Sequence, residues 1–320
     1  MPKQKTYDIA IIGAGVVGLA GAIYSGRMNL KTIVFGNERG GTLAKTHVVE
    51  NYPGFISLSG PELTEKILEH TKAYSNNVDI IMKPVINITG NVGCFKIFTK
   101  DEQFTSKTLL FATGSKYREL GVQGEQEFKN KGVHYCALCD GPLYKGKILA
   151  VVGGGDSAVK EALLLSEYGK KVYLFARSTI KPEPINLERM KKNKKIEAYE
   201  GVEIKEIKGD KFVNEIILTK PIHSSKFSNK LKLDAVFVEI GHIPLSELAV
   251  KLGVKVNDEQ EIIITREART NVKGIYAAGD VGDLKFKQAV TGVGEAVTAI
   301  YAIYEDLKKG EISVSCVDER

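Results

Sequence analysis

The sequence predicts an α/β protein with two mostly parallel sheets, and three features of the chain support this fold class. An apolar run at residues 8–12 leads into a glycine turn at 13–18 and then into a helix of small residues. A second apolar run at 148–152 leads into another glycine turn at 153–158 and another helix. Continuous apolar runs that end in glycine and a helix are typical of buried parallel strands in βαβ units. Late in the chain, a third glycine-rich run at 274–281 begins no further βαβ unit.

The late glycine-rich run indicates how the two units are connected. Since it adds no unit of its own, we expect it to complete the first sheet, so that the second unit is an insertion. The expected architecture is two Rossmann-like, three-layer (ββα) domains, the second inserted in the first. A length of 320 residues is more than one compact core usually holds, which agrees with two domains. We expect a discontinuous first domain at residues 1–117 and 246–320 and a second domain at 118–245.

The remaining elements follow from local sequence patterns. The helix after the first glycine turn is expected to reach about residue 28, and a strand at 32–35 completes the first βαβ unit. The helix of the second unit is expected to reach about residue 168, and a strand at 172–175 follows it. A long apolar helix is expected at 290–307. Shorter apolar or β-branched runs predict further strands at 78–82, 94–99, 108–111, 203–207, 215–219 and 235–240.

The charge pattern argues against a nucleic-acid partner. The net charge is +6, but the basic residues are spread along the sequence. The densest basic cluster, Lys191–Lys195, lies near Glu188 and Glu197. No aromatic residues alternate with it as they do in proteins that bind single strands. We therefore interpret the cluster as a solvated helix end.

Composition and hydropathy predict a soluble cytoplasmic protein. Hydrophobic residues make up 43% of the chain and charged residues 26%, which is ordinary for a globular protein. No apolar stretch approaches the roughly 18 residues that a membrane span needs, and Met1–Lys5 leads directly into a strand. We therefore expect no membrane association. Four cysteines in so long a chain are too few for a disulfide scaffold, which favours the reducing cytoplasm.

The segment 136–139, Cys-Ala-Leu-Cys, is the sharpest chemical signal in the sequence. Two thiols separated by two residues can close a small disulfide ring and reopen it. A zinc site needs four ligands, and although His134 is near, Cys94 and Cys316 are distant and no fourth ligand is evident. Two structural thiols are the other alternative, but they would not require this spacing. We favour a redox dithiol of Cys136 and Cys139 and expect no metal.

Asp140 directly follows the second thiol and adds a titratable group to the dithiol. A thiolate that leaves during disulfide exchange must be protonated, and a neighbouring carboxyl group can act as the acid–base. Asp140 also precedes Gly141-Pro142, so a turn-forming role is the alternative interpretation.

The two glycine turns predict dinucleotide sites. Glycines let the backbone approach a pyrophosphate, and the helix N-terminus supplies N–H groups and the positive end of its dipole. Glu38 stands where an acidic residue would accept from a ribose hydroxyl, so the first turn suits a dinucleotide without a 2′-phosphate, such as FAD. Arg177 stands at the matching place in the second unit, where a cation suits the 2′-phosphate of NADPH. The alternatives are tight turns without a ligand and, for Arg177, an ordinary surface charge.

Beyond these separate signals, the chain resembles the low-molecular-weight thioredoxin reductases of the bacterial and archaeal type. The resemblance extends from Asp8 to about Tyr304, with motifs in the order and spacing of that family. The motifs are Gly13–Gly18, Arg39–Leu43, Glu50–Gly54, Ala112–Gly114, Cys136–Gly141, Gly153–Ala158, Ile240–Pro244, Gly274–Val281 and Gln288–Val290.

The resemblance implies a homodimeric reductase that passes electrons from NADPH or NADH through FAD to the dithiol and on to a thioredoxin-like protein. It implies that Cys139 faces the flavin, that Cys136 attacks the substrate disulfide and that Asp140 is the acid–base. It also implies that the inserted domain rotates to present the dithiol and the nicotinamide to the flavin in turn. The residues implied for FAD are Gly13, Gly15, Gly18, Glu38, Gly41, Thr42, Asn51, Val85, Ala112, Thr113, Gly114, Gly279, Asp280, Gln288, Ala289 and Val290. The residues implied for the nicotinamide nucleotide are Gly153, Gly155, Asp156, Ser157, Arg177 and Gly241.

The chain departs from the family where the nicotinamide nucleotide would bind. The family has His-Arg-Arg after this strand and another Arg four residues on, whereas this chain has Ala176-Arg177-Ser178 and then Pro182, with Lys181 beside it. A lost bidentate phosphate contact costs on the order of 1–3 kcal/mol. We therefore expect a weakened preference for NADPH over NADH. A donor that is neither nucleotide, another protein acceptor and a non-catalytic nucleotide-sensing flavoprotein remain as alternatives.

Overall fold

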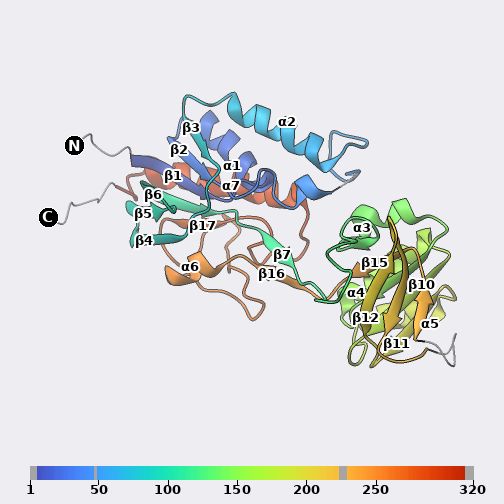
Figure 1. Ribbon diagram of the computed structural model, residues 1–320. Helices are drawn as coiled ribbons and strands as arrows, with labels where there is room; N and C mark the ends of the chain where they lie inside the picture. The colour runs from blue at the N-terminus through green and yellow to red at the C-terminus, as the bar shows by residue number, and fades with distance from the viewer. Residues whose placement is uncertain (1–5, 47–48, 223–228, 314–320) are drawn as a thin grey trace. The chain divides into compact units, whose positions relative to one another are not determined.

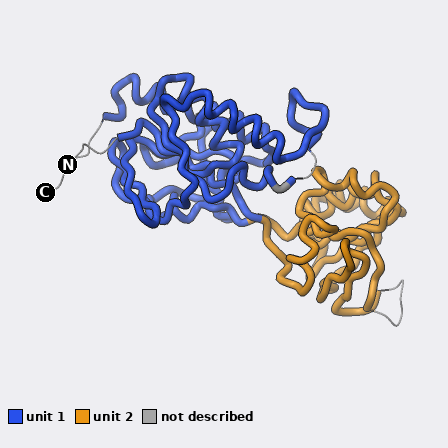
Figure 2. Tube along the Cα trace, turned by 45° about the horizontal axis from the view of Figure 1, so that its top comes forward, with its two compact units in different colours: residues 1–116, 243–320 blue, residues 117–242 orange. Residues whose placement is uncertain are grey.

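The computed structural model describes residues 6–46, 49–222 and 229–313. The chain forms two compact units: unit 1 comprises residues 1–116 and 243–320, and unit 2 comprises residues 117–242 (Figure 2). The breaks expected from the sequence lie after residues 117 and 245. Each unit has a sheet and hydrophobic clusters of its own.

Unit 1 is built on a seven-stranded sheet (Figure 1). Its strands are β1 (Thr6–Ile12), β2 (Thr32–Phe35), β3 (Val78–Ile81), β4 (Asn87–Asn91), β5 (Cys94–Phe98), β6 (Gln103–Phe111) and β17 (Ile275–Ala277). The order is β3-β2-β1-β6-β5-β4, with β17 also paired to β6. β4, β5 and β6 pair in antiparallel fashion, and the other pairs are parallel. The pairing of β17 with the end of β6 confirms that the late glycine-rich run completes this sheet.

Helices cover the sheet of unit 1. They are α1 (Val16–Arg27), α2 (Gly60–Lys72), α6 (Glu247–Lys251) and α7 (Ala289–Lys308), with the 3-10 turn η1 (Leu43–Lys45). Gly21 lets α1 pack closely, since a Cβ there would lie 3.3 Å from the Leu110 side chain and 3.6 Å from Ala296 of α7. α2, which the sequence analysis did not predict, begins with a capping box. Its N-cap Ser59 and Glu62 each accept a hydrogen bond from the backbone N–H of the other.

Unit 2 contains a parallel sheet and a smaller antiparallel sheet. The parallel sheet has β8 (Val133–His134), β9 (Ile148–Val152), β10 (Lys171–Ala176), β11 (Ile196–Glu200) and β15 (Ala235–Val238). Its order is β11-β10-β9-β15-β8. The antiparallel sheet has β12 (Ile204–Gly209), β13 (Val213–Leu218) and β14 (Lys230–Lys232). The helices are α3 (Ala137–Asp140), α4 (Asp156–Tyr168) and α5 (Pro184–Lys192), with the 3-10 turn η2 (Gly141–Tyr144).

The central strands of unit 2 explain why its sequence reads as continuous apolar runs. Leu149 of β9, Leu174 of β10 and Phe237 of β15 are all 0% exposed. Both faces of a parallel sheet are covered, so the strands have no polar side. The parallel sheets and their flanking helices confirm the predicted α/β class. Across the described ranges, no helix combines the length and the apolar character needed to cross a bilayer.

The chain passes between the two units twice, and short strands mark both crossings. β7 (Ser115–Tyr117) and β16 (His242–Pro244) pair with each other in a two-stranded sheet. The Arg118 N–H donates to Gly241 O at 2.9 Å, and Gly241 has a φ of +101°. A positive φ favours glycine, so Gly241 shapes the crossing.

Candidate active site

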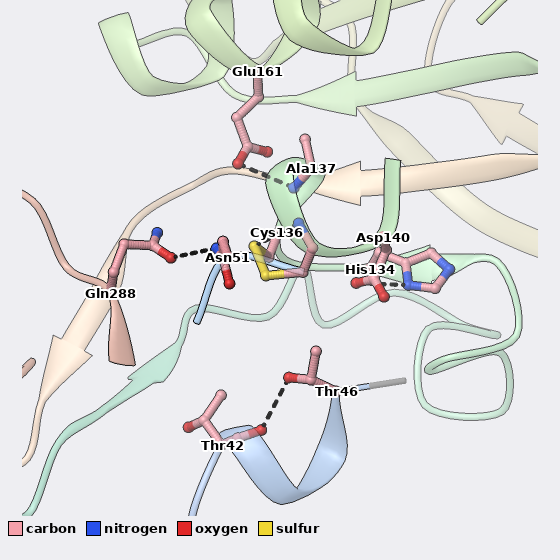
Figure 3. Close-up of a disulfide and its surroundings, with 10 residues drawn as sticks. Thr42, Thr46, Asn51, His134, Cys136, Ala137, Asp140, Glu161 and Gln288 are labelled. Atoms are coloured by element: carbon pink, nitrogen blue, oxygen red, sulfur yellow. Dashed lines mark hydrogen bonds and ion pairs between the residues drawn. A yellow bond between two sulfur atoms is a disulfide. The ribbon is translucent and has the colours of Figure 1, made fainter. Parts of the chain in front are cut away.

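Cys136 and Cys139 form a disulfide at the start of α3, directly after β8 (Figure 3). Their Cα atoms are 5.3 Å apart, within the range that a disulfide requires. Cys136 is the N-cap residue of α3, and its Sγ accepts a hydrogen bond from the Cys139 N–H at 3.2 Å. A backbone donor at this sulfur stabilises a thiolate once the disulfide is reduced. Both cysteines are partly exposed in unit 2.

Asp140, at the end of α3, faces a buried histidine. Asp140 Oδ2 lies 3.2 Å from His134 Nδ1, although the two atoms do not meet the geometry of a hydrogen bond. His134 Nε2 and the Tyr144 hydroxyl oxygen are 2.7 Å apart. Burial, followed by the charges of Asp140 and Asp234, raises the pKa of Tyr144 to about 12. Three titratable side chains therefore lie in a row beside the disulfide.

A pair of carboxyl groups, Glu161 on α4 and Glu239 after β15, connects the dithiol segment to the second glycine turn. The Ala137 N–H donates to Glu161 Oε1 at 3.1 Å (Figure 3). Ser157 Oγ donates to Glu239 Oε2 at 3.1 Å. The two carboxyl groups are also within hydrogen-bond reach of each other. This arrangement joins the residue after Cys136 to the first turn of α4.

The Glu161–Glu239 pair requires a proton. Glu161 Oε2 is buried, and no donor among the described residues reaches it. Two facing carboxylates have only acceptors, so a hydrogen bond between them needs one of them to be protonated. Burial, and then the neighbouring Glu239, raises the pKa of Glu161 to about 9. Burial also raises the pKa of Glu239.

The first glycine turn has the backbone geometry of a phosphate cradle. Gly13 has a φ of +127°, and a Cβ there would overlap the carbonyl group of Ala112. A Cβ at Gly18 would overlap the carbonyl group of Gly13. Gly15 differs, because a Cβ there would find its nearest atom, Gly40 O, 4.0 Å away. Gly15 is also the N-cap of α1, and no side chain caps this end. Helix N–H groups with open space before them suit a pyrophosphate.

The structure brings together several residues that were predicted for FAD in unit 1. The Asn51 side-chain amide donates to Gln288 Oε1 at 3.0 Å, which joins positions 237 residues apart (Figure 3). A Cβ at Gly41 would lie 3.4 Å from the Cα of Gly15. The other predicted residues lie after strands or at helix starts of the same unit. They are Glu38 after β2, Thr42 before η1, Val85 after β3, Ala112, Thr113 and Gly114 after β6, Gly279 and Asp280 after β17, and Ala289 and Val290 at the start of α7.

The surroundings of the first glycine turn contain buried polar groups and open space that suit a dinucleotide. Thr64 Oγ1 is buried without a hydrogen-bond partner among the described residues, and a Cβ at Gly40 would lie 2.5 Å from it. The Gly279 N–H donates to Glu295 Oε2 at 2.8 Å, and burial raises the pKa of Glu295. A Cβ at Gly114 would meet no atom within 4 Å. An open, glycine-lined edge at the carboxyl ends of parallel strands is where α/β folds bind dinucleotides, and these residues fit FAD.

The second glycine turn repeats the backbone plan of the first. Gly153 has a φ of +156°, and a Cβ there would overlap the carbonyl group of Glu239. Gly155 is the open position, because a Cβ there would meet no atom within 4 Å. Gly155 is also the N-cap of α4, again without a side-chain cap. The backbone therefore offers a second dinucleotide cradle.

The side chain of Asp156, which was predicted to bind the nicotinamide nucleotide, is engaged within the protein. Its Oδ1 accepts from the Glu183 N–H and from the Asn186 side-chain amide, both at 2.8 Å. Its Oδ2 lies 2.6 Å from Lys160 Nζ. Asp156 thus fixes the start of α5.

The side chains after β10 carry little positive charge. Arg177 and Ser178 are exposed. Glu200, at the end of the neighbouring strand β11, accepts from the Ile180 N–H at 2.7 Å. The Lys181 N–H donates to Gly154 O at 2.8 Å, so this segment packs on the glycine turn. Arg177 and Glu200 are therefore the charged side chains at the ends of β10 and β11, and Lys181 adds one cation to the segment that follows.

The basic cluster at 191–195 is a helix end, as predicted. α5 ends at Lys192, which lies 2.6 Å from Glu188. Lys195 Nζ donates to the carbonyl oxygens of Ser166 at 2.8 Å and Gly169 at 3.1 Å. These lysines are therefore partly engaged within unit 2.

Four side chains beside the dithiol were missed or misassigned by the sequence analysis. The sequence pattern indicated His134 only as a possible metal ligand, and it indicated no role for Tyr144, Glu161 or Glu239. No group of His, Cys, Asp or Glu side chains in the described part of the chain is arranged to hold a metal ion. One signal could have revealed Glu161: it falls among the buried residues Ala158 and Ala162 of α4, where an ionisable side chain is unexpected.

Comparison with known proteins gives a consistent family match. The model of the pyridine nucleotide-disulphide oxidoreductases matches residues 7–296. The thioredoxin reductase of Bacillus subtilis is 35% identical over 308 residues, which cover 95% of each chain. The crystal structure of thioredoxin reductase from Streptococcus pyogenes has a TM-score of 0.85 at 34% identity and covers 95% of this chain and 99% of that one. A ferredoxin-flavin thioredoxin reductase from Clostridium acetobutylicum has a TM-score of 0.50 at 33% identity, with 95% and 99% covered.

Proposed function

The chain belongs to the pyridine nucleotide-disulphide oxidoreductase family and, within it, to the thioredoxin reductases, and from this premise we propose that it reduces a thioredoxin-like protein through Cys136 and Cys139. The observation that carries the proposal is the disulfide between these residues, with Asp140 beside it, in the same unit as the second glycine turn. The proposal includes a homodimer and a cytoplasmic location, which the resemblance implies.

The first glycine turn and its surroundings would hold FAD. Gly13, Gly15 and Gly18 would cradle the pyrophosphate, and Glu38 would accept from the ribose hydroxyl. The other residues predicted for FAD would line the same site in unit 1. Bound FAD would supply the two-electron transfer between a nicotinamide nucleotide and the disulfide. NADH or NADPH would bind at Gly153, Gly155, Ser157, Arg177 and Gly241.

The two cysteines have unequal roles in the proposal. Two electrons and two protons convert the Cys136–Cys139 disulfide to the dithiol. Cys136, whose sulfur accepts the Cys139 N–H, would attack the disulfide of the partner as a thiolate and form a mixed disulfide. Cys139 would then attack Cys136 Sγ and release the second thiol of the partner. Asp140 would donate a proton to a departing thiolate and become a carboxylate.

The donor is the least constrained part of the proposal. Arg177 is the one cation at the end of β10, and the carboxylate of Glu200 stands at the end of the next strand. With only Lys181 as a further cation in the segment that follows, a 2′-phosphate is disfavoured, so we propose that NADH serves at least as well as NADPH. The same observation favours a second candidate donor. The similar protein from Clostridium acetobutylicum is a ferredoxin-flavin thioredoxin reductase, and two molecules of a reduced ferredoxin could supply the two electrons one at a time.

Anaerobic titration of the purified flavoprotein tests the proposal. We expect the wild-type protein to take up about four electrons, and a variant with Cys136→Ser and Cys139→Ser to take up about two. Equal uptake by both proteins would show that the cysteines are not redox partners of the flavin. Adding NADH, NADPH and reduced ferredoxin in separate reactions then identifies the donor. Turnover with an oxidised thioredoxin identifies the acceptor, and failure to reduce it while small disulfides are reduced would point to another protein.

A further inference from the structure

His134 is the least exposed titratable side chain in the row beside the disulfide. Its side chain is 2% exposed, and that of Asp140 is 13% exposed. The ring of His134 stacks on the ring of Phe237 with a centroid distance of 5.4 Å. It also meets the ring of Tyr144 edge to face, with a centroid distance of 5.3 Å. Tyr144 in turn meets Phe237 edge to face at 5.9 Å. The rings of His134, Tyr144 and Phe237 thus pack on one another, and His134 lies next to Asp140 (Figure 3).

The contacts of His134 decide which ring nitrogen carries the proton in its neutral form. The carboxyl group of Asp140 lies beside Nδ1, so a proton on Nδ1 is favoured there. Nε2 is then an acceptor, and the Tyr144 hydroxyl, 2.7 Å away, donates to it. A tyrosine keeps its hydroxyl proton at neutral pH even at its usual pKa of about 10. Burial, mainly, raises the pKa of Tyr144 further, to about 12, so its hydroxyl stays a donor. The Nδ1–H of His134 is therefore directed at Asp140.

A buried polar atom without a partner is costly, and Asp140 is the group that can satisfy Nδ1. Nδ1 has no hydrogen bond among the described residues, although Asp140 Oδ2 lies 3.2 Å away. Catalytic hydrogen bonds are often poorly aligned in the free enzyme and tighten when substrate binds. A small rotation of the Asp140 carboxyl group would complete this one.

We propose that His134, held by Tyr144, is a positioning residue for Asp140: its Nδ1–H orients the Asp140 carboxyl group and stabilises the carboxylate that forms when Asp140 gives its proton to a departing thiolate. The proposal rests on the proposed function only in taking Asp140 as the proton donor. In the step, the Cys136 thiolate forms an S–S bond to one sulfur of the substrate disulfide, and the substrate S–S bond breaks. The electron pair of the broken bond stays on the departing sulfur, which takes the proton of Asp140. His134 keeps its own proton throughout.

The need for a proton donor depends on how acidic the leaving thiol is, so disulfides with leaving thiols of different acidity test the role of His134. A disulfide with a strongly acidic leaving thiol, such as 5,5′-dithiobis(2-nitrobenzoate), needs no proton from the enzyme. A disulfide of an ordinary aliphatic thiol, such as 2-hydroxyethyl disulfide, does. Full-length protein is reduced with dithiothreitol and desalted, and its reaction with each disulfide is followed by stopped flow. No nucleotide is needed for this measurement.

Three variants and a matched control separate the positioning of Asp140 from general damage to the protein. His134→Phe keeps a ring on Phe237 but removes both nitrogens, and we expect about a tenfold loss with 2-hydroxyethyl disulfide and less than twofold with the acidic disulfide. Tyr144→Phe should give a smaller loss in the same pattern. His134→Asn places an amide N–H near the position of Nδ1 and should restore most of the rate. Tyr135→Phe removes another buried hydroxyl, which donates to Glu125 at 2.9 Å, and should leave both rates unchanged.

The outcomes distinguish this inference from the proposed function. If His134→Phe slows both disulfides equally, His134 acts on the fold or on the attacking thiol, and the inference is wrong. If Asp140→Asn slows 2-hydroxyethyl disulfide selectively but His134→Phe does not, Asp140 is the proton donor without help from His134. If Asp140→Asn has no selective effect, the proton step of the proposed function fails as well.

Discussion

The two glycine turns, at 13–18 in unit 1 and 153–158 in unit 2, share a backbone plan but differ in the helix that follows each. Both begin with a glycine of positive φ, and both have an open glycine at the helix N-cap. Counted from the first glycine of each turn, Val16, Val17 and Gly21 of α1 correspond to three polar residues of α4. These polar residues are Asp156, Ser157 and Glu161.

This difference shows that the turn sets the shape of a dinucleotide cradle while its neighbours set the chemistry. Each turn packs closely against the end of the following strand, and each contact is made by one glycine and one alanine. The glycine lies after the strand in unit 1 but in the turn in unit 2. Ala14 faces Gly36 in unit 1, whereas Gly154 faces Ala176 in unit 2. The helix after the first turn is apolar and packs against α7, so its site is shaped by other loops. The helix after the second turn instead carries the carboxyl group that contacts the dithiol segment.

The largest expected effect comes from a glycine that the fold requires. Gly18→Ala would push a Cβ into the carbonyl group of Gly13, and we expect a loss of about 3 kcal/mol or more in the free energy of unfolding. Flavin should be lost with it. Gly294→Ala, in α7 with no atom within 4 Å of its Cβ, is the control and should be neutral or slightly stabilising. Urea unfolding measures both, and a Gly18→Ala protein as stable as the wild type would contradict the close packing.

The open glycines give a more selective test of the two cradles. Gly15→Ala and Gly155→Ala should both fold normally, since a Cβ meets no close atom at either position. Each Cβ would, however, occupy the space that a pyrophosphate needs. We expect Gly15→Ala to weaken flavin binding about tenfold or more, and Gly155→Ala to slow reduction of the flavin by NADH and NADPH by a similar factor. Flavin content and stopped-flow reduction measure the two effects. An unaffected Gly155→Ala protein would mean that the second turn does not bind the donor.

Much of the fold could be predicted because its signals are local. The apolar strands, the glycine turns and the α7 helix each show in a short stretch of sequence. β7 and β16 could not be predicted, because each is three residues long and is stabilised by pairing with the other far along the chain. β11 was missed because its sequence, Ile-Glu-Ala-Tyr-Glu at 196–200, has neither a continuous apolar run nor strict alternation, and none of its residues is buried. Edge position accounts for this, since β11 ends the parallel sheet.

The residues of the candidate site also differ in whether a local sequence pattern indicates them. Cys136, Cys139 and Asp140 are adjacent in sequence, so spacing alone pointed to their chemistry. The Glu161–Glu239 pair could not be foreseen, because it depends on α4 and the end of β15 meeting in the fold. The bond between Asn51 and Gln288 also needs the folded chain, although resemblance had indicated both residues. The individual cofactor roles remain predictions.

The Glu161–Glu239 pair predicts that the stability of the protein depends on pH. The helix α1 of unit 1 makes no matching contribution, because Gly21 stands where α4 has Glu161. The pKa of Glu161 is raised from 4.5 to about 9, so the folded state holds a proton that the unfolded state releases between these values. Stability contributed by this group is therefore fully present below pH 4.5 and declines as the pH rises toward 9. Glu161→Gln should flatten this decline by up to about 1.4 kcal/mol per pH unit. Urea unfolding from pH 6 to 9 measures the slope, with Glu188→Gln as a surface control.

The smallest expected effect is on the preference between NADPH and NADH at the second glycine turn. Glu200 places a carboxylate at the strand end beside Arg177, and its repulsion of a 2′-phosphate is weakened by solvent because both side chains are exposed. Glu200→Gln should therefore raise the NADPH-to-NADH ratio of kcat/KM only about two- to fivefold. Ser178→Arg, which adds a donor that can bind phosphate in bidentate fashion, should raise it further, and Glu203→Gln should leave it unchanged. If neither Glu200→Gln nor Ser178→Arg alters the ratio, the 2′-phosphate does not lie at these strand ends. The contrast between the two turns would then lie in α4 alone.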